Sequence, residues 1–440
     1  MNININPQDK LILLCAKINP TAHDLDLINN LLTEITNWEA FATHIIKKSF
    51  APLLYIKLDY LPNANLIPES IKTLLKATYY KTSSRSILLL KTFADCLLVL
   101  KSNNIDIIAL KGIYLSDWLY KNPALRLMSD VDLLVKEADG IRCVELLKEI
   151  GFVQYQFVKN ISSFSDKIDY EAFLNSGEAH FLPLQKANIY LEIHTKLQNR
   201  KEQNQQIIPE IWKHAKPITL NELPVLALDN YNLLIHLCLH LHKHITVLKH
   251  VQFMSFADIT NILCEIDGSK NNCNVDLNAE KKTLSMGFES FVWDEFVAKC
   301  TMSNCLYTVF KYLILCKEYF NAPLPNYLFE KYKNTFTDYD RDLFLKHLSG
   351  YDFTAFANQS YFPIHARNIK YITNPLLKLR YVLDVVFPPK SFMVFKYLQN
   401  NNQPEPKTAS NTNQHSVKFW WIWYPYRWWK GLKGIVIKKR

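Results

Sequence analysis

The spacing of apolar residues changes near residue 104, and this change constrains the fold more than any other feature of the sequence. Before it, apolar side chains recur every three to four residues, as in the stretch 87–100, which is the period of an amphipathic helix. After it, short apolar or alternating runs predict buried strands separated by short helices. From about residue 224 the helical period returns. We therefore expect a compact module of strands and helices embedded between two helical regions.

Three strands and two helices are expected in this module. The strands are predicted at residues 105–110, 130–135 and 189–194, and the helices at residues 113–120 and 139–150. Gly151 follows the second helix, in the position where glycine commonly ends a helix. The expected fold class is therefore α+β, with strands and helices mixed in one compact module.

The predicted elements divide the chain into five parts. These are a helical N-terminal region (1–101), the strand-containing module (102–222), a helical C-terminal region (223–398), a polar flexible linker (399–415) and a basic, tryptophan-rich tail (416–440). Within the C-terminal region, the helical pattern is strongest from Leu223 to Leu263.

Composition excludes some classes of protein. Glycine is scarce, with 9 residues in 440, and no Gly-x-Gly-x-x-Gly or Walker A string occurs, which argues against a Rossmann domain. The 9 cysteines form no Cys-x-x-Cys pair, and the first residues lack the pattern of a secretory signal. Runs of eighteen or more apolar residues without charge are also missing from the sequence. We expect a protein of the reducing cytoplasm without a transmembrane helix.

Two acidic residues share one face of the second predicted strand. Asp130 and Asp132 are two positions apart, so their side chains point the same way and repel each other unless cations lie between them. Carboxylates at this spacing suit Mg²⁺, and Glu192 on the third strand adds a third acid. An Asp-x-Asp pair also occurs by chance as a cap or turn, so the prediction depends on the surrounding strands.

At this point the sequence resembles a known family, the bacterial nucleotidyltransferases often described as uncharacterised, within the polymerase-β-like superfamily. The resemblance is carried by Leu110-Lys111-Gly112, by the run from Arg126 to Val135, by Gly151-Phe152 and by Leu191-Glu192-Ile193-His194. It is clear over about 85–265 and weaker to about 398.

The resemblance implies a polymerase-β-like fold, with a small mixed sheet flanked by helices. It also implies a nucleotidyltransferase that uses two Mg²⁺ (or Mn²⁺) ions and a nucleoside triphosphate. Asp130, Asp132 and Glu192 would be the catalytic, metal-binding acids, and the turn at Gly112 would approach the phosphates with backbone N–H groups. Ile113 follows this glycine where the superfamily usually has Ser or Gly, which leaves a weaker, altered or lost activity open.

Two cations and two histidines lie near the acids in the sequence. Lys111 and Arg126 are candidates for binding phosphate, and Arg126 is able to bind it bidentately; the alternatives are pairing with Asp130 or, for Lys111, exposure to solvent. His194 follows Glu192 on the same strand face and is expected to support the metal site. His180 is a weaker candidate.

The helix predicted after residue 223 carries three histidines at a spacing of four residues. His236, His240 and His244 share one face. A zinc site is one interpretation. The other is a helix packed over the module, with His240 or His244 at the rim of the active site; the resemblance extends through this helix to Asp258.

The net charge of +10 is concentrated at the C-terminus. The tail of residues 416–440 contains seven Lys or Arg residues, no acid and five of the nine tryptophans, so the rest of the chain is near +3. Aromatic and cationic side chains together favour the membrane–water interface or a protein partner over nucleic acid.

We therefore expect a Mg²⁺-dependent transfer of a nucleoside monophosphate from a triphosphate to an unknown hydroxyl or phosphate acceptor. The alternative is a catalytically weak or inactive binding protein of the same fold, docked through its tail to a partner or to the inner face of the membrane. A zinc hydrolase built on His236 is a third hypothesis.

Overall fold

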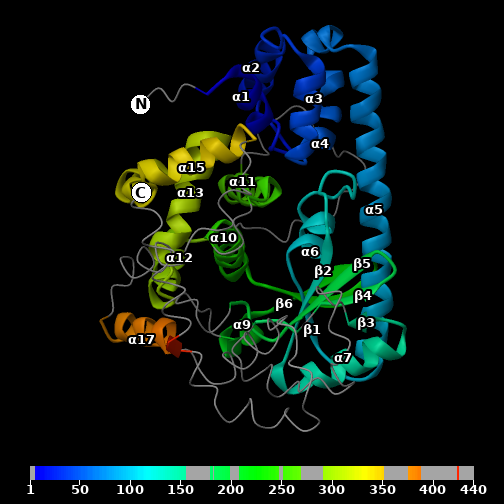
Figure 1. The fold of residues 1–440 in the computed structure, drawn as a ribbon, viewed down its shortest axis with the longest axis vertical. Coiled ribbons are helices and arrows are strands. Elements are labelled where there is room, and N and C mark those ends of the chain that lie inside the picture. The colour runs from blue at the N-terminus through cyan, green and yellow to red at the C-terminus, as the bar shows by residue number, and fades with distance from the viewer. Residues whose placement is uncertain are drawn as a thin grey trace, which may run out of the picture.

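The computed structural model describes residues 5–154, 179–181, 183–198, 208–246, 251–268, 291–350, 375–387 and 424–425. Figure 1 shows a sheet in the lower part of the molecule, with helices of the N-terminal region above it and helices of the C-terminal region to one side. The expected linker lies outside the described residues, as does the tail apart from Tyr424 and Pro425.

The described strands form one mixed sheet of seven strands, in the order β3-β4-β5-β2-β1-β7-β6. The strands are β1 (Ile107–Ala109), β2 (Asp130–Val135), β3 (Val153–Gln154), β4 (Leu184–Lys186), β5 (Ile189–His194), β6 (Lys216–Leu220) and β7 (Leu223–Ala227). β2 pairs in parallel with β5 and antiparallel with β1, which in turn pairs in parallel with β7. The two strands that carry the expected acids are therefore neighbours in the centre of the sheet.

The N-terminal region is helical, as expected. It comprises α1 (Pro7–Leu14), α2 (Ala22–Leu32), α3 (Trp38–Lys47), α4 (Ala51–Tyr55), two short 3₁₀ helices at Leu58–Tyr60 and Pro62–Leu66, and the long α5 (Glu69–Ser102). Thr21 and Asp24 form a capping box at the start of α2, which satisfies backbone N–H groups of its first turn. Figure 1 shows α5 running the length of the molecule beside the sheet, where it contacts β2 and α7.

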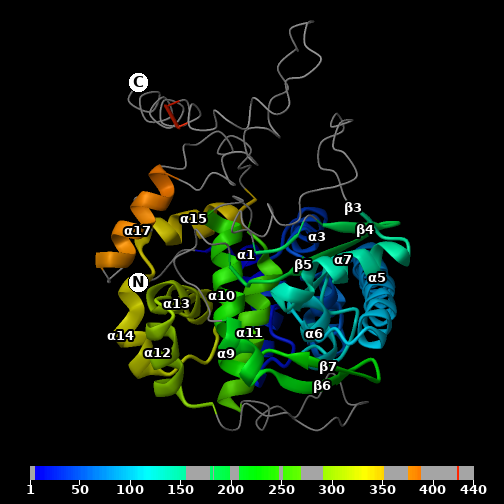
Figure 2. The same cartoon turned by 90° about the horizontal axis from the view of Figure 1, so that it is seen from below.

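The helices between and after the strands complete the structure. They are α6 (Lys111–Trp118), a 3₁₀ helix at Glu137–Asp139, α7 (Gly140–Glu149), α9 (Ile208–His214), α10 (Asn230–Thr246), α11 (Phe253–Asp267), α12 (Trp293–Met302), α13 (Leu306–Phe320), α14 (Asn326–Tyr332), a 3₁₀ helix at Lys333–Thr335, α15 (Asp338–Leu348) and α17 (Pro375–Val386). In Figure 2, α10 and α11 lie between the strands and the helices α12–α14.

The alternation of residues along β2 positions the acids. Val131, Leu133 and Val135 are completely buried, while Asp130 and Asp132 point to the opposite face of the sheet. α5 and α7 contact β2 and β5 respectively, and their apolar side chains join the same core as these valines and leucine. The acids therefore face away from this apolar layer.

Buried polar contacts join the N-terminal helices to the C-terminal ones. The Asn261 side chain of α11 donates to the carbonyl of Ala16 and accepts from the N–H of Ile18, both just after α1. Asn321, at the end of α13, donates to Asp24 of α2. The buried apolar residues of all these helices belong to one continuous core.

One expectation about secondary structure was wrong at residues 223–227. The helical stretch expected from Leu223 begins only at Asn230, because Leu223–Ala227 forms β7 and pairs with β6 in an antiparallel hairpin. Two further differences are small: the strand expected over 105–110 spans 107–109, and the helix expected over 113–120 begins at Lys111. The strands at 130–135 and 189–194 are confirmed.

None of the helices in the described parts of the chain is both long and apolar enough to cross a membrane. The eight cysteines within those parts are free thiols, and all but the partly buried Cys264 are buried.

Candidate functional site

The parallel pairing of β2 with β5 brings two of the expected acids together. Asp132 is the direct partner of Glu192 in the register of the two strands, and Asp130 is the partner of Tyr190. The Asp132 side chain is almost fully buried, whereas about a quarter of the Glu192 side chain (23%) is exposed. The site therefore has one carboxylate inside the protein and one that reaches solvent.

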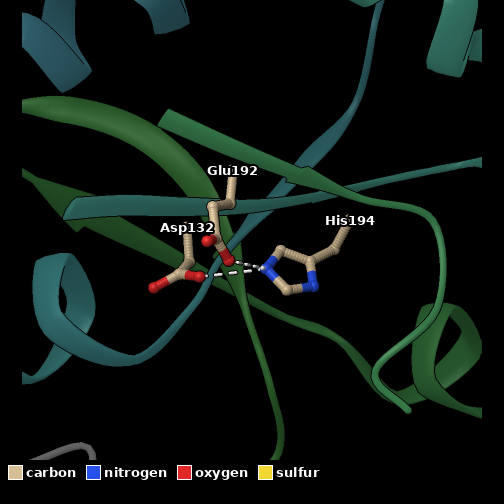
Figure 3. A group of neighbouring side chains, drawn as sticks. All are labelled: Asp132, Glu192 and His194. Atoms are coloured by element: carbon tan, nitrogen blue, oxygen red, sulfur yellow. Dashed lines mark hydrogen bonds and ion pairs between the residues drawn. The ribbon is translucent and has the colours of Figure 1, made fainter. Parts of the chain in front are cut away.

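His194 joins these two carboxylates from the end of β5. Its Nε2 atom lies 2.9 Å from Asp132 Oδ1 and 3.4 Å from Glu192 Oε2, as Figure 3 shows. Ligand atoms of Asp132, Glu192 and His194 all lie within 4.8 Å of one another, and among the described residues this is the one group of three with such spacing. These three side chains have the chemistry and the proximity to hold a divalent cation.

Lys111 is the cation closest to the acids. Its Nζ atom lies 2.7 Å from Asp132 Oδ1 and 3.0 Å from His240 Nε2. The residue opens α6 with a backbone φ of 42°, a conformation that a side chain with a Cβ rarely adopts. The sharp change of direction between β1 and α6 thus turns the buried ammonium toward the carboxylates.

The charges of the site hold each other in the ionised state. Burial acts to raise the pKa of Asp132, but the Lys111 ammonium and the hydrogen bond from His194 lower that pKa well below its ordinary value. Burial likewise acts against the ionised form of Glu192, and the hydrogen bond with His194 lowers its pKa to about 2. The pKa of Lys111 is raised, because the three acids outweigh its burial.

Asp130 has a different environment from the other two acids. Its carboxylate accepts a hydrogen bond from the Ser129 hydroxyl at 2.9 Å and is not part of the group formed by Asp132, Glu192 and His194. Burial and the neighbouring Asp132 charge raise the pKa of Asp130 to about 6. A nearby cation would relieve this repulsion and favour the ionised carboxylate.

Gly112 and Arg126 meet beside the site. A Cβ atom on Gly112 would lie 2.7 Å from Arg126 Nη1 and 3.1 Å from the Met128 side chain, so any larger residue here would require the Arg126 side chain to shift. Arg126 forms a bidentate ion pair with Asp258 of α11, at 3.0 and 2.7 Å. The Tyr120 hydroxyl donates to the same carboxylate at 2.9 Å. Arg126 therefore pairs with Asp258 and not with Asp130, the partner considered from the sequence.

Of the three histidines spaced four residues apart on α10, the middle one, His240, contacts Lys111. His240 Nε2 is 3.2 Å from His244 Nε2 and 3.0 Å from the Lys111 ammonium. His236 is buried, and neither of its ring nitrogens has a hydrogen-bond partner among the described residues. Within that part of the chain, the three do not form a group with metal-ligand spacing. His240 thus contacts the site through Lys111. The ring of His180 lies next to that of His194, with the two ring centroids 5.0 Å apart.

Two partners in the site were not predicted from the sequence. These are the Lys111–Asp132 ion pair and the role of Asp258 as the counterion of Arg126. Asp258 does carry a signal, because it is a single acid in the otherwise apolar and polar-neutral stretch 253–263 of a buried helix. A buried charge in such a setting predicts a buried partner, but it does not say which one.

A central sheet with paired acids on adjacent strands, flanked by helices, is an arrangement suited to metal-assisted phosphoryl chemistry. In the comparison with protein families, the model described as "Uncharacterised nucleotidyltransferase" matches residues 34–321. The chain belongs to this nucleotidyltransferase family. No curated protein matches the chain, and no solved structure does. The matched range includes the whole sheet, the three acids and α10 and α11.

Proposed function

We propose that this protein transfers a nucleoside monophosphate from a nucleoside triphosphate to a hydroxyl or phosphate group of an acceptor. The observation that carries the proposal is the register of β2 and β5, which sets Asp132 directly beside Glu192 with Asp130 two residues away. Membership of a nucleotidyltransferase family supports a nucleotide substrate and a divalent cation at the coarse level.

The donor set fits a divalent cation such as Mg²⁺ or Mn²⁺. Asp132 and Glu192 would hold it, with Asp130 available on the same strand face. When bound, the cation would neutralise charge on the triphosphate and activate the acceptor oxygen.

The residues around the acids have complementary roles in this proposal. Lys111 places a buried ammonium against Asp132, and in this proposal that charge would also bind a phosphate oxygen of the triphosphate. The first turn of α6, beginning at Lys111 and Gly112, supplies backbone N–H groups for the same phosphates. Arg126, held by Asp258 against Gly112, fixes the position of this turn.

Release of pyrophosphate tests the proposal. Wild-type protein is incubated with Mg²⁺, each of the four common triphosphates and mixtures of sugar, nucleotide, peptide and RNA acceptors. We expect release with at least one mixture, and a loss of at least about 100-fold in Glu192→Gln and in Asp132→Asn, because a catalytic cation stabilises the transition state by several kcal/mol. Glu149→Gln and Asp106→Asn, which change exposed acids, are the matched controls. Undiminished release in Glu192→Gln would refute the assignment.

A second candidate function is a binding protein of the same fold with weak or no catalysis. It is favoured by the fact that Lys111 and Arg126, the cations expected at the phosphates, form ion pairs with Asp132 and Asp258. Ile113, in the position where the superfamily usually has Ser or Gly, also favours this candidate. For this candidate we expect no pyrophosphate release with any acceptor, and loss of membrane or partner binding when residues 416–440 are deleted.

A further inference from the structure

We propose that His194 is a direct ligand of the cation held by Asp132 and Glu192, so that the site binds a transition-metal ion such as Mn²⁺ in preference to Mg²⁺. The proposal deepens the proposed function, on which it rests for the presence of a cation, and it adds a nitrogen ligand to the set of acids.

The position of the imidazole is the first argument. Glu192 and His194 are two residues apart on β5 and therefore point to the same face, toward Asp132 on β2. His194 Nε2 is the ring atom nearest both carboxylates, at 2.9 Å from Asp132 Oδ1 and 3.4 Å from Glu192 Oε2. In Figure 3 the ring points its Nε2 edge toward the two carboxylates. A cation bound by these oxygens would have Nε2 within reach without a change of rotamer.

The chemistry of the donor set is the second argument. Mg²⁺ prefers oxygen ligands and keeps several waters, whereas an imidazole nitrogen beside carboxylates suits first-row transition metals. Three protein ligands also leave coordination positions for substrate oxygens, as in catalytic metal sites. Because Asp132 and His194 are buried, few water molecules can compete with them for a cation bound there.

The neighbouring histidines are poorer candidates. His240 contacts the Lys111 ammonium at 3.0 Å, and it is not in the group of described side chains whose ligand atoms lie within 4.8 Å of one another. His236 has no carboxylate of a described residue bonded to either ring nitrogen. His194 is thus the described histidine that combines proximity to two carboxylates with a Nε2 atom directed at them.

A structural role for His194 is the competing explanation, and the two differ in a measurable way. As a positioning residue, His194 would only donate a hydrogen bond from Nε2 to the carboxylates. The amide of glutamine places an N–H donor at a similar distance from the backbone, so His194→Gln would preserve that role. If His194 is a metal ligand, His194→Gln removes the ligand, because the glutamine amide nitrogen does not coordinate a metal ion as an imidazole nitrogen does.

The test uses the full-length protein after removal of metal with a chelator. Mn²⁺ binding is measured by loss of the free-ion electron paramagnetic resonance signal, and spin-echo modulation of the bound ion reports coupling to ligand nitrogen. Mg²⁺ binding is measured by calorimetry. The variants are His194→Gln and, as a matched buried-histidine control, His236→Gln, with thermal unfolding as a check on folding.

We expect ¹⁴N coupling in the wild type and in His236→Gln, and its loss in His194→Gln. Mn²⁺ affinity should fall by at least about tenfold in His194→Gln, with a smaller change for Mg²⁺. Bound Mn²⁺ without nitrogen coupling, or an unchanged Mn²⁺ affinity in a folded His194→Gln, would overturn the inference. Triphosphate binding without nitrogen coupling would leave the proposed function intact, whereas nitrogen-coupled Mn²⁺ without triphosphate binding would overturn the function alone.

Discussion

Lys111 combines an unusual backbone with an unusual side-chain environment. Its φ of 42° costs a residue with a Cβ of the order of 1 kcal/mol or more. Its ammonium is buried and neutralises Asp132 from 2.7 Å. Strain at a residue that contacts the candidate metal ligands is consistent with a functional role for this turn, which the Leu110-Lys111-Gly112 string indicated in the sequence.

Replacing Lys111 with methionine tests whether its charge is shared between Asp132 and phosphate. In Lys111→Met we expect tighter binding of the divalent cation alone, because the ammonium no longer competes for Asp132. We also expect triphosphate affinity to fall about 10- to 100-fold, because a charge-assisted contact to phosphate is lost. Calorimetry measures both constants, and Lys136→Met, an exposed lysine paired with Asp106, is the control. Equal triphosphate affinity in Lys111→Met and the control would contradict the assignment.

At the scale of elements, the sequence predicted those strands whose residue pattern differs clearly from that of the segments next to them. β5 alternates apolar and polar residues, β2 places two acids two positions apart before an apolar run, and both strands were predicted with their exact bounds. β6 and β7 were missed: β7 continues directly into the apolar pattern of α10, and each of the two strands contains a proline. The local residue pattern does not identify which side chains form ion pairs with each other. Arg126 and Asp258 are 132 residues apart, so their ion pair becomes visible only in the folded chain.

The Arg126–Asp258 pair fixes the segment between α6 and β2 to α11. The carbonyl of Arg126 also accepts a hydrogen bond from Ser86 of α5. We expect Asp258→Asn to lower the free energy of unfolding by about 3–5 kcal/mol, because it leaves a buried guanidinium without its counterion. Chemical denaturation measures this, with Asp267→Asn, an exposed acid of the same helix, as control. A loss no larger than that of the control would show that the pair contributes little.

A second buried pair predicts how stability depends on pH. Burial acts to raise the pKa of Asp24, but the Lys17 ammonium at 2.8 Å and hydrogen bonds from Thr21 and Asn321 lower it below its ordinary value. Because the folded-state pKa is depressed, the stabilisation is fully present above the ordinary pKa of about 3.9 and is lost as the pH falls through the lower folded value.

We therefore expect Asp24→Asn to lose less stability than the wild type when the pH falls below about 4. At pH 7 the variant should be less stable than the wild type by about 3–5 kcal/mol. Denaturation curves at pH 3 to 7 measure both effects. Asp26→Asn, an exposed change in the same helix, provides the comparison. If wild type and Asp24→Asn lost stability in parallel over this range, the carboxylate would not be the titrating group.

At the scale of the whole molecule, helices from both sides of the strand-containing module in the sequence contribute residues next to its site. Helix α10 supplies His240 to Lys111, and α11 supplies Asp258 to Arg126. The sequence predicted an α+β arrangement, but it gave no measure of how the regions contact each other, because such contacts join residues far apart in the chain. The match to the nucleotidyltransferase family likewise extends beyond the sheet on both sides. The division into regions and the role of the tail remain proposals.

The proposed function requires the acids on β2 and β5 to bind a triphosphate together with a divalent cation. Calorimetric titration of the wild type with ATP, GTP, CTP and UTP, each with Mg²⁺, with Mn²⁺ and without metal, tests it most directly. We expect metal-dependent binding of at least one triphosphate, abolished in Asp130→Asn/Asp132→Asn and retained in Asp106→Asn. Metal-independent binding, equal binding in the double variant, or no binding of any triphosphate to the wild type would contradict it.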